Sequence, residues 1–219
     1  GNLYSDLAYS LQGVADLDAD GDDDIILRKG STGKWRQFNV QSGAIVSNKG
    51  IGVYSATKWE FRFADDTDGD GDDDIVLRNN ENGTWRVFTV DDAANPTNSV
   101  TSNANLELFV NTAWAYAFSG DVDGDGDADA VLRNTGTGAW KLFALQNNAY
   151  VSNVAFGLPT GSTWSLQQAG DADADDDVDV ILRTSTDNSW RRYETVSGNT
   201  SSSNFISLGL YGNALWVTQ

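Results

Sequence analysis

Short apolar runs separated by acidic or glycine-rich turns recur along the whole chain. In the segments Trp59–Phe63 and Trp114–Phe118, aromatic residues occupy every second position, which is typical of a β-strand with two distinct faces. The run Ile25–Leu27 is short, apolar and mostly β-branched, as in a strand buried on both faces. No stretch has the apolar spacing of an amphipathic helix. The pattern therefore predicts an all-β chain.

Four copies of one segment organise the sequence. Each begins with alternating aspartates, continues into a short apolar run and ends at an arginine; the copies are Asp16–Arg28, Asp66–Arg78, Asp121–Arg133 and Asp171–Arg183. A tryptophan follows each arginine after a constant interval, at Trp35, Trp85, Trp140 and Trp190. Another aromatic residue precedes each leading aspartate, at Tyr9, Trp59, Trp114 and Trp164, and Trp216 repeats that position near the C-terminus. A period of about 50 residues predicts a repeat architecture.

Each repeat is expected to contain four strands. The first carries the leading aromatic residue, and the second is the apolar run Ile25–Leu27 with its copies Ile75–Leu77, Ala130–Leu132 and Val180–Leu182. Turns able to supply a positive φ angle follow at Thr32-Gly33, Asn82-Gly83, Thr137-Gly138 and Asp187-Asn188. The third strand carries the tryptophan, and a weaker fourth strand is expected at Ala44–Ser47, Leu106–Val110, Val151–Phe156 and Phe205–Leu208.

Four antiparallel strands in about 50 residues make one blade of a β-propeller. We therefore expect a single propeller domain over residues 1–219, with repeats at 7–56, 57–111, 112–161 and 162–213 and an extra strand at 214–219. A β-sandwich requires no such period, and a parallel β-helix uses much shorter rungs. Tyr9 and Trp216 occupy equivalent positions, and a four-bladed ring has room for one of them. Three arrangements stay open: a segment of a larger ring, a homo-oligomer that completes the ring, or an extra strand used as a clasp.

The aspartates have the spacing of a metal-binding loop, D-x-D-x-D-G-x-x-D. In the second copy these residues are Asp66, Asp68, Asp70, Gly71 and Asp74. Side chains at positions 1, 3, 5 and 9, with the carbonyl oxygen at position 7, can surround a cation, and glycine at position 6 permits the sharp turn. Without a cation the carboxylates repel one another. The loop suits Ca²⁺ better than Mg²⁺, which prefers a small octahedral site, so we expect about four Ca²⁺, one per repeat.

An EF-hand loop begins with the same spacing but requires a glutamate at position 12. Position 12 of the second copy is Leu77, inside an apolar run, which excludes an EF-hand. The fourth copy has Ala174 and Asp176 where the second copy has glycines. Because aspartate tolerates the left-handed region better than most residues, we expect a calcium site there as well.

The pattern D-x-D-G-D-G-x-x-D-I-x-L-R…T-G-x-W resembles the FG-GAP/VCBS repeats of secreted and cell-surface proteins, and the resemblance covers nearly the whole chain. It implies propeller blades with one Ca²⁺ between the first two strands of each blade. Complete family rings have more blades than the four repeats of this chain. The metal ligands that the resemblance implies are Asp16, Asp18, Asp20, Asp22, Asp24, Asp66, Asp68, Asp70, Asp72, Asp74, Asp121, Asp123, Asp125, Asp127, Asp129, Asp171, Asp173, Asp175, Asp177 and Asp179.

The other repeated residues are expected to be structural. The arginines are predicted to form ion pairs with a neighbouring blade or an Asp loop, and the leading aromatic residues to form the core between blades. Packing is also the favoured role of the tryptophans after the turn, with stacking on a sugar ring as the alternative. These candidate ligand-binding residues are Trp35, Trp85, Trp140 and Trp190.

Composition excludes several functional classes. The 219 residues include no cysteine and no histidine, which rules out disulfides, zinc sites of the Cys/His kind and His-based triads. A net charge of −18 disfavours a nucleic-acid partner, and no apolar stretch approaches the ~20 residues that a membrane span needs. The acidic residues outside the loops show no glycosidase-like pair, so we expect no enzyme activity.

Together these features predict a secreted or cell-surface binding or adhesion module stabilised by calcium. The expected partner is a glycan, in a lectin-like role, or a cell-surface protein. Two alternatives are an ancillary propeller domain of a secreted polysaccharide-degrading or proteolytic enzyme, and a structural scaffold for protein interactions. The chain begins at Gly1 and contains no methionine, so we expect a mature, trimmed or excised segment.

Overall fold

The computed structural model describes residues 8–172, 178–195 and 205–209, and over these residues the chain forms strands and no helix. No described helix therefore has the length and apolarity that a bilayer crossing requires. The predicted extra strand at 214–219, with Trp216, lies outside the described residues. The strands are β1 (Tyr9–Ala15), β2 (Asp24–Lys29), β3 (Trp35–Gln41), β4 (Ala44–Ile51), β5 (Trp59–Asp65), β6 (Asp74–Asn79), β7 (Trp85–Val90), β8 (Val100–Leu106), β9 (Trp114–Gly120), β10 (Asp129–Asn134), β11 (Trp140–Gln146), β12 (Ala149–Phe156), β13 (Trp164–Gly170), β14 (Asp179–Thr184), β15 (Trp190–Tyr193) and β16 (Ile206–Ser207).

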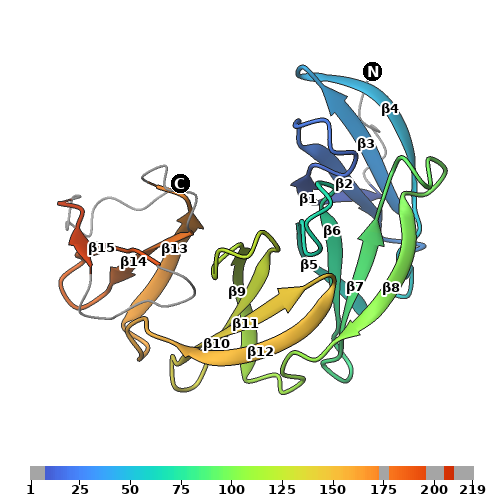
Figure 1. Cartoon of the computed structure of the whole chain (residues 1–219). Coiled ribbons are helices and arrows are strands. Elements are labelled where there is room, and N and C mark those ends of the chain that lie inside the picture. Colours follow the sequence, from blue (N-terminus) through green and yellow to red (C-terminus); the bar gives the residue numbers. More distant parts are fainter. Residues whose placement is uncertain (1–7, 173–177, 196–204, 210–219) are drawn as a thin grey trace. The chain divides into compact units, whose positions relative to one another are not determined.

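The strands form four four-stranded antiparallel sheets, each made of strands consecutive in the sequence (Figure 1). Sheet 1 contains β1–β4, sheet 2 contains β5–β8, sheet 3 contains β9–β12 and sheet 4 contains β13–β16. This order, in which every strand pairs with the next, is the topology of a propeller blade. The predicted fold class, an all-β propeller of four-stranded antiparallel blades, is confirmed.

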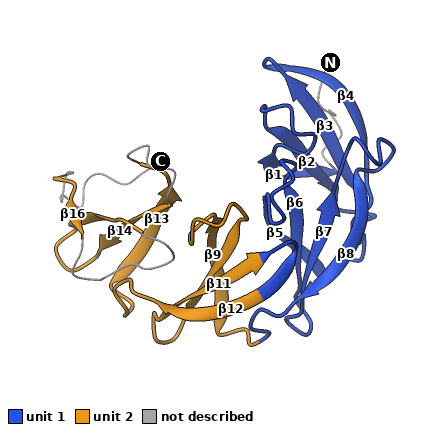
Figure 2. Ribbon diagram, in the orientation of Figure 1, with its two compact units in different colours: residues 1–110, 146–150 blue, residues 111–145, 151–219 orange. Residues whose placement is uncertain are grey.

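The chain divides into two compact units (Figure 2). Unit 1 comprises residues 1–110 and 146–150, and unit 2 comprises residues 111–145 and 151–219. In unit 1 the first strands of sheets 1 and 2, β1 and β5, are neighbours, and both sheets contribute to one apolar core that includes Trp35, Ile75 and Phe88. In unit 2 the same relation holds for β9 and β13, with a core that includes Trp140 and Tyr193. Inner strands of successive sheets thus lie together within each unit.

The second strand of sheet 2 is its best-buried element, as its apolar sequence predicts. All six residues of β6 are buried, including its polar ends Asp74 and Asn79. The leading aromatic residues Trp59 and Trp164 are partly buried and pack against the cores of their units. The predicted role between blades is therefore confirmed for Trp59 and Trp164, whereas for Tyr9 and Trp114 it stays a prediction.

The turns after the second strands have the predicted backbone. Gly33, Gly83, Gly138 and Asn188 all have positive φ, between 60° and 76°. At Gly33 a second constraint adds to the first, because a Cβ atom there would lie 1.7 Å from the carbonyl oxygen of Ser55. Glycine is required at this position both for the turn and for the close approach of the next segment of unit 1.

One strand prediction is wrong. The fourth strand of sheet 2 is β8, at Val100–Leu106, and not Leu106–Val110. The reason is the long turn at residues 91–99, in which Asp91 and Ser99 are joined by a backbone hydrogen bond of 2.8 Å. This turn places Val100 opposite Val90, so that pairing starts earlier than the apolar residues of the sequence suggest.

Candidate metal centre

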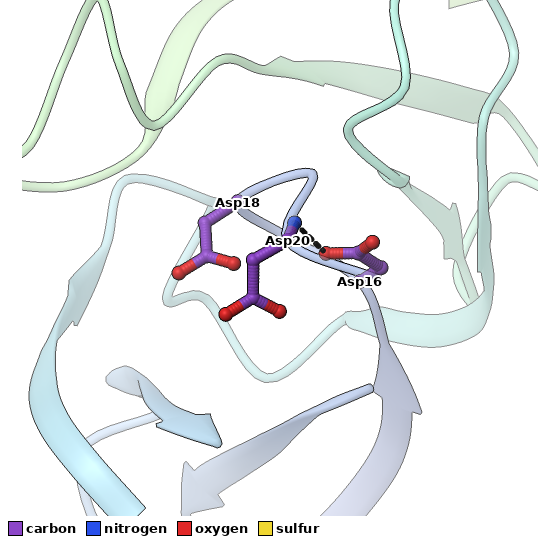
Figure 3. A group of neighbouring side chains, drawn as sticks. All are labelled: Asp16, Asp18 and Asp20. Atoms are coloured by element: carbon purple, nitrogen blue, oxygen red, sulfur yellow. Dashed lines mark hydrogen bonds between the residues drawn. The ribbon is translucent and has the colours of Figure 1, made fainter. Parts of the chain in front are cut away.

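The aspartate-rich loops connect the first and second strands of the sheets. In three of them, three carboxylate oxygens lie within 4.8 Å of one another. The groups are Asp16, Asp18 and Asp20; Asp66, Asp68 and Asp70; and Asp121, Asp123 and Asp129. Figure 3 shows the first group, whose three side chains converge at the loop between β1 and β2. The structure thus brings predicted positions 1, 3 and 5 together in two loops, and positions 1, 3 and 9 in the third.

The aspartate at position 1 organises the first three loops through the backbone. In the second loop, Asp66 Oδ1 accepts the N–H of Gly69 at 2.7 Å, and Oδ2 accepts the N–H of Gly71 at 2.9 Å. Asp121 makes equivalent contacts with Gly124 and Gly126. These bonds close the loop around the carboxylate, and the glycine at position 6 has the positive φ that the tight turn needs, 97° at Gly71.

The aspartate at position 3 has an unsatisfied carboxylate oxygen in the first and third loops. Asp18 Oδ1 and Asp123 Oδ1 are both buried without a hydrogen-bond partner. Burial, followed by the charges of Asp125 and Asp121, raises the pKa of Asp123. A buried carboxylate oxygen without a donor is costly in free energy, and a cation in the loop would remove that cost. The donor set in the three loops therefore fits a divalent ion.

The aspartate at position 9 is buried at the start of the second strand. Asp24, Asp74 and Asp129 accept the backbone N–H groups of Val40, Val90 and Leu145 at 2.8–2.9 Å. Burial raises the pKa of Asp24 to about 6, and the pKa values of Asp74 and Asp129 to about 7. Asp129 belongs to a converging group, whereas Asp24 and Asp74 lie outside the first two groups.

At position 7 the sequence predicts that the backbone carbonyl oxygen binds the ion. The aspartate side chains at this position differ in their surroundings from loop to loop. Asp22 Oδ2 accepts the N–H of Ser42 at 2.6 Å. Burial and then the charge of Asp70 raise the pKa of Asp72 to about 7. Asp127 is buried as well. The metal-ligating roles of Asp22, Asp72 and Asp127 stay predictions.

The fourth loop is only partly described, since Asp173, Asp175 and Asp177 lie outside the described residues. Asp179, its position-9 aspartate, is buried and forms an ion pair of 3.1 Å with Arg192. Arg192 also pairs with Glu194 at 2.7 Å. A guanidinium therefore already faces Asp179, and the predicted fourth calcium site stays a prediction.

The repeated tryptophans are packing residues in the first three sheets. Trp35, Trp85 and Trp140 have exposed fractions of 3%, 0% and 2%. Each indole N–H donates to a backbone carbonyl, that of Tyr54 in the case of Trp35, and the preceding arginine covers each ring at 4.5–4.8 Å. The rings of Trp35 and Trp85 leave no face for a sugar, so the ligand-binding alternative is wrong for these two residues. Trp140 lines the pocket of unit 2 described below, and its ligand-binding role stays a prediction. Trp190 is half-buried and stays a prediction.

Two of the repeated arginines, Arg28 and Arg133, contact the next sheet of their unit, but through its backbone. Arg28 Nη1 donates to the carbonyl oxygen of Trp59 at 2.6 Å, and Nη2 to that of Ala56 at 3.0 Å. In unit 2, Arg133 Nη2 donates to the carbonyl oxygens of Gly161 and Trp164 at 2.9 and 2.7 Å. The predicted link between neighbouring blades is right, whereas the partners of these arginines are carbonyl oxygens instead of the predicted carboxylates.

Unit 2 also contains a pocket of about 440 Å³, lined by residues that include Tyr116, Arg133, Trp140 and Leu166. In unit 1 the residue equivalent to Leu166 is Phe61, whose ring lies 6.4 Å from that of Trp35. The smaller leucine leaves space beside Trp140. The pocket combines apolar walls with the polar side chains of Asn134, Thr135 and Ser162, a mixture typical of small-molecule sites.

No protein-family model matches the chain, and no curated protein matches its sequence. Among solved structures, it is similar to a protein of unknown function from Bacteroides caccae, with 12% sequence identity and a TM-score of 0.39. The similarity covers 92% of this chain and 58% of that one, so the chain spans little more than half the length of that protein. A likeness at this level is no evidence about function.

Proposed function

We propose that the chain is a calcium-stabilised binding or adhesion module of the FG-GAP/VCBS type that works outside the cell. The observation that carries the proposal is the buried, unpartnered Oδ1 atom of Asp18 and of Asp123, each within a loop where three carboxylates converge. Protein groups leave these oxygens unsatisfied, and a bound cation would satisfy them.

Calcium is the ion that the donor set favours. The three groups offer only oxygen atoms, several of them charged, in an irregular loop without histidine or cysteine. Ca²⁺ accepts six to eight such ligands in flexible geometry, whereas Mg²⁺ demands a small octahedron and retains its waters. Position 1, held by backbone N–H groups, would keep its carboxylate in place while the ion neutralises the loop.

The role we assign to the ion is structural. Each loop joins the first and second strands of a sheet, and the second strand is buried on both faces. Ca²⁺ supplies the positive charge that offsets repulsion among the carboxylates, so that the loop no longer opposes folding of the strands it connects. Free calcium reaches millimolar concentrations outside cells, within the 10⁻⁴–10⁻³ M range at which extracellular modules commonly bind. This supports a secreted or surface location.

We propose that the module binds a carbohydrate and that the pocket of unit 2 is the binding site. Tyr116 and Trp140 contribute an apolar wall, and the polar side chains around them offer hydrogen-bonding groups, a combination that suits a sugar ring. We propose binding without catalysis, because the sequence offers no paired carboxylates outside the loops.

Thermal unfolding with and without calcium tests the metal proposal. A site at a hundred times its dissociation constant gains about 2.7 kcal/mol, so millimolar Ca²⁺ should raise the Tm above its value in EDTA by several degrees. The same concentration of Mg²⁺ is the control and should have a smaller effect. Identical melting curves in Ca²⁺ and EDTA would contradict the proposal.

A glycan array in the presence of Ca²⁺ tests the ligand class. Binding should weaken in Tyr116→Ala and persist in Tyr150→Ala, a tyrosine outside the pocket. If the wild-type protein binds no glycan while Ca²⁺ still stabilises it, the carbohydrate proposal fails and the metal proposal stands.

A further inference from the structure

An amide fixes the position-3 aspartate of the first loop. Asn39, on β3 of the same sheet, is 4% exposed and donates from Nδ2 to Asp18 Oδ2 at 2.5 Å. This bond holds one oxygen of the carboxylate and leaves the other, Oδ1, free for a cation. Asn39 therefore orients a predicted ligand without itself belonging to the spacing pattern.

The second sheet lacks this asparagine but has an amide in the same place. The residue equivalent to Asn39 is Thr89, whose side chain is shorter and has no amide. Asp68 Oδ2 instead accepts Nδ2 of Asn148 at 2.5 Å. Asn148 lies in the turn between β11 and β12, which belongs to unit 1, and its Nδ2 is also 3.1 Å from Thr89 Oγ1. The amide of Asn148 thus contacts both Asp68 and the threonine that stands where sheet 1 has Asn39.

The backbone of Asn148 is suited to this role. Its φ angle is 62°, its exposed fraction is 8%, and its N–H donates to the carbonyl oxygen of Thr67 at 3.0 Å. The Thr67 hydroxyl is in hydrogen-bond contact with Asn148 Oδ1 and lies 2.8 Å from Asp74 Oδ2. Asn148 is therefore linked directly to position 3 and, through Thr67, to position 9 of the second loop.

The corresponding turn of sheet 2 serves the first loop in a similar way. Ser99 immediately precedes β8, as Asn148 precedes β12, and has a φ angle of 61° and no exposed surface. Its hydroxyl lies 2.7 Å from Gln37 Oε1, and Gln37 Nε2 donates to Asp24 Oδ2 at 2.9 Å. The equivalent residue of sheet 1 is Gly43, which has no side chain. A Cβ atom added at Gly43 would meet no other atom within 4 Å.

We propose that Asn148, in the β11–β12 turn, is a positioning residue for the calcium site of the second loop. This inference rests on the proposed function. Groups that orient metal ligands typically account for a 10–100-fold difference in metal affinity. By fixing Asp68, Asn148 reduces the rearrangement needed when the ion binds. Occupancy of the loop and docking of the β11–β12 turn then stabilise each other.

The experiment is a calorimetric titration of the full chain with CaCl₂. Asn148→Gly removes the amide while keeping a residue that favours positive φ. We expect it to weaken one Ca²⁺ site about tenfold and to leave the others unchanged. Asn147→Gly is the matched control, because Asn147 is the exposed neighbour in the same turn, with a φ of 51°, and this change should leave all sites unaffected.

Two further variants identify the site. In Asp68→Asn the same site should be weakened, and adding Asn148→Gly to it should cause no further loss, since both changes act on one ligand. In Asn148→Gly/Thr89→Asn the amide returns from the strand, as in sheet 1, and the lost affinity should be recovered at least in part. If Asn148→Gly is too unstable to titrate, Asn148→Ser replaces it in each comparison. Serine is the residue at the corresponding position of sheet 2, Ser99.

The outcomes separate the two proposals. If the wild-type chain binds no Ca²⁺, the proposed function fails. If it binds Ca²⁺ and Asn148→Gly binds with unchanged affinity, this inference alone is overturned. A merely structural role for Asn148 would lower the Tm equally in Ca²⁺ and in EDTA with intact affinity, which would also overturn it.

Discussion

The buried carboxylate of Asp74 accepts a hydrogen bond from the backbone N–H of Val90 at 2.9 Å. The bond fastens the end of the second Asp loop to the last residue of β7, and the same contact recurs in sheets 1 and 3. The hydrogen bond from Val90 favours the ionised carboxylate and lowers its pKa. Burial has the larger and opposite effect, so that the pKa of Asp74 is raised to about 7. The loops therefore hold carboxyl groups that resist ionisation in the metal-free protein.

We predict that the metal-free protein becomes more stable on mild acidification. The pKa values of Asp74 and Asp129 rise from about 3.8 to about 7 on folding, so between these values the folded state binds more protons than the unfolded state. Stability then falls as the pH increases through this window. In EDTA, the Tm should be higher at pH 5 than at pH 7.5. A lower Tm at pH 5 would contradict the raised pKa values.

Asp74→Asn should have opposite effects with and without calcium. Asparagine keeps an acceptor for the Val90 N–H and removes a buried charge, and the Thr67 hydroxyl can reverse to accept from the new amide. In EDTA the variant should melt at or above the wild-type temperature, and in millimolar Ca²⁺ below it, because a predicted ligand is lost. Asp23→Asn, at an exposed position outside the predicted ligand set, should change neither value appreciably. Lower stability of Asp74→Asn in both buffers would count against a role for this charge in metal binding.

Gly33→Ala should destabilise the protein more than Gly43→Ala does. Both glycines have positive φ, 66° and 76°, so alanine is strained at either, by about 1–2 kcal/mol. At Gly33 the new Cβ atom also lies 1.7 Å from the carbonyl oxygen of Ser55, whereas at Gly43 nothing lies within 4 Å. Overpacking of this kind adds about 1–3 kcal/mol. Urea unfolding measures both; equal losses would show that the Ser55 segment moves aside freely.

Arg28→Lys should lower stability by about 1–3 kcal/mol, although charge is retained. Lysine cannot donate to the carbonyl oxygens of Trp59 and Ala56 and also cover Trp35 as the guanidinium does, with Cζ 4.6 Å from the ring centroid. Arg36→Lys is the control, since Arg36 makes an exposed contact with Asn48 and its replacement should cost less than about 0.5 kcal/mol. The free energies of unfolding from urea titrations give the comparison, and equal losses would refute the proposed bridging role of Arg28.

Features that depend on a few consecutive residues were predictable. The positive φ angles of Gly33 and Gly71 follow from turn chemistry, and the burial of β6 follows from its apolar sequence. The prediction failed for β8, because the register of that strand depends on a long turn closed by its own hydrogen bonds, between Asp91 and Ser99 among others. Such a turn leaves no periodic signal.

The roles of the aromatic residues needed the packed structure. Trp35 follows a polar turn, and its sequence neighbours are compatible with an open or a buried ring. Its burial results from contacts with Phe61 and Arg28, which lie on other strands. Recurrence in every repeat shows that an aromatic residue is needed at this position. It does not show whether the ring is buried or exposed.

By itself, the sequence determined the four-strand repeat, the turns and the aspartate spacing, because each is a local pattern that recurs within about 50 residues. Only the tertiary structure decided how the carboxylates are oriented. Asn148 reaches Asp68 from 80 residues away, and its counterpart in sheet 1, Asn39, lies at a different place in the repeat. A side-chain donor of this kind only has to lie near the carboxylate in space. It need not occupy a fixed position in the repeat, so no spacing pattern reveals it.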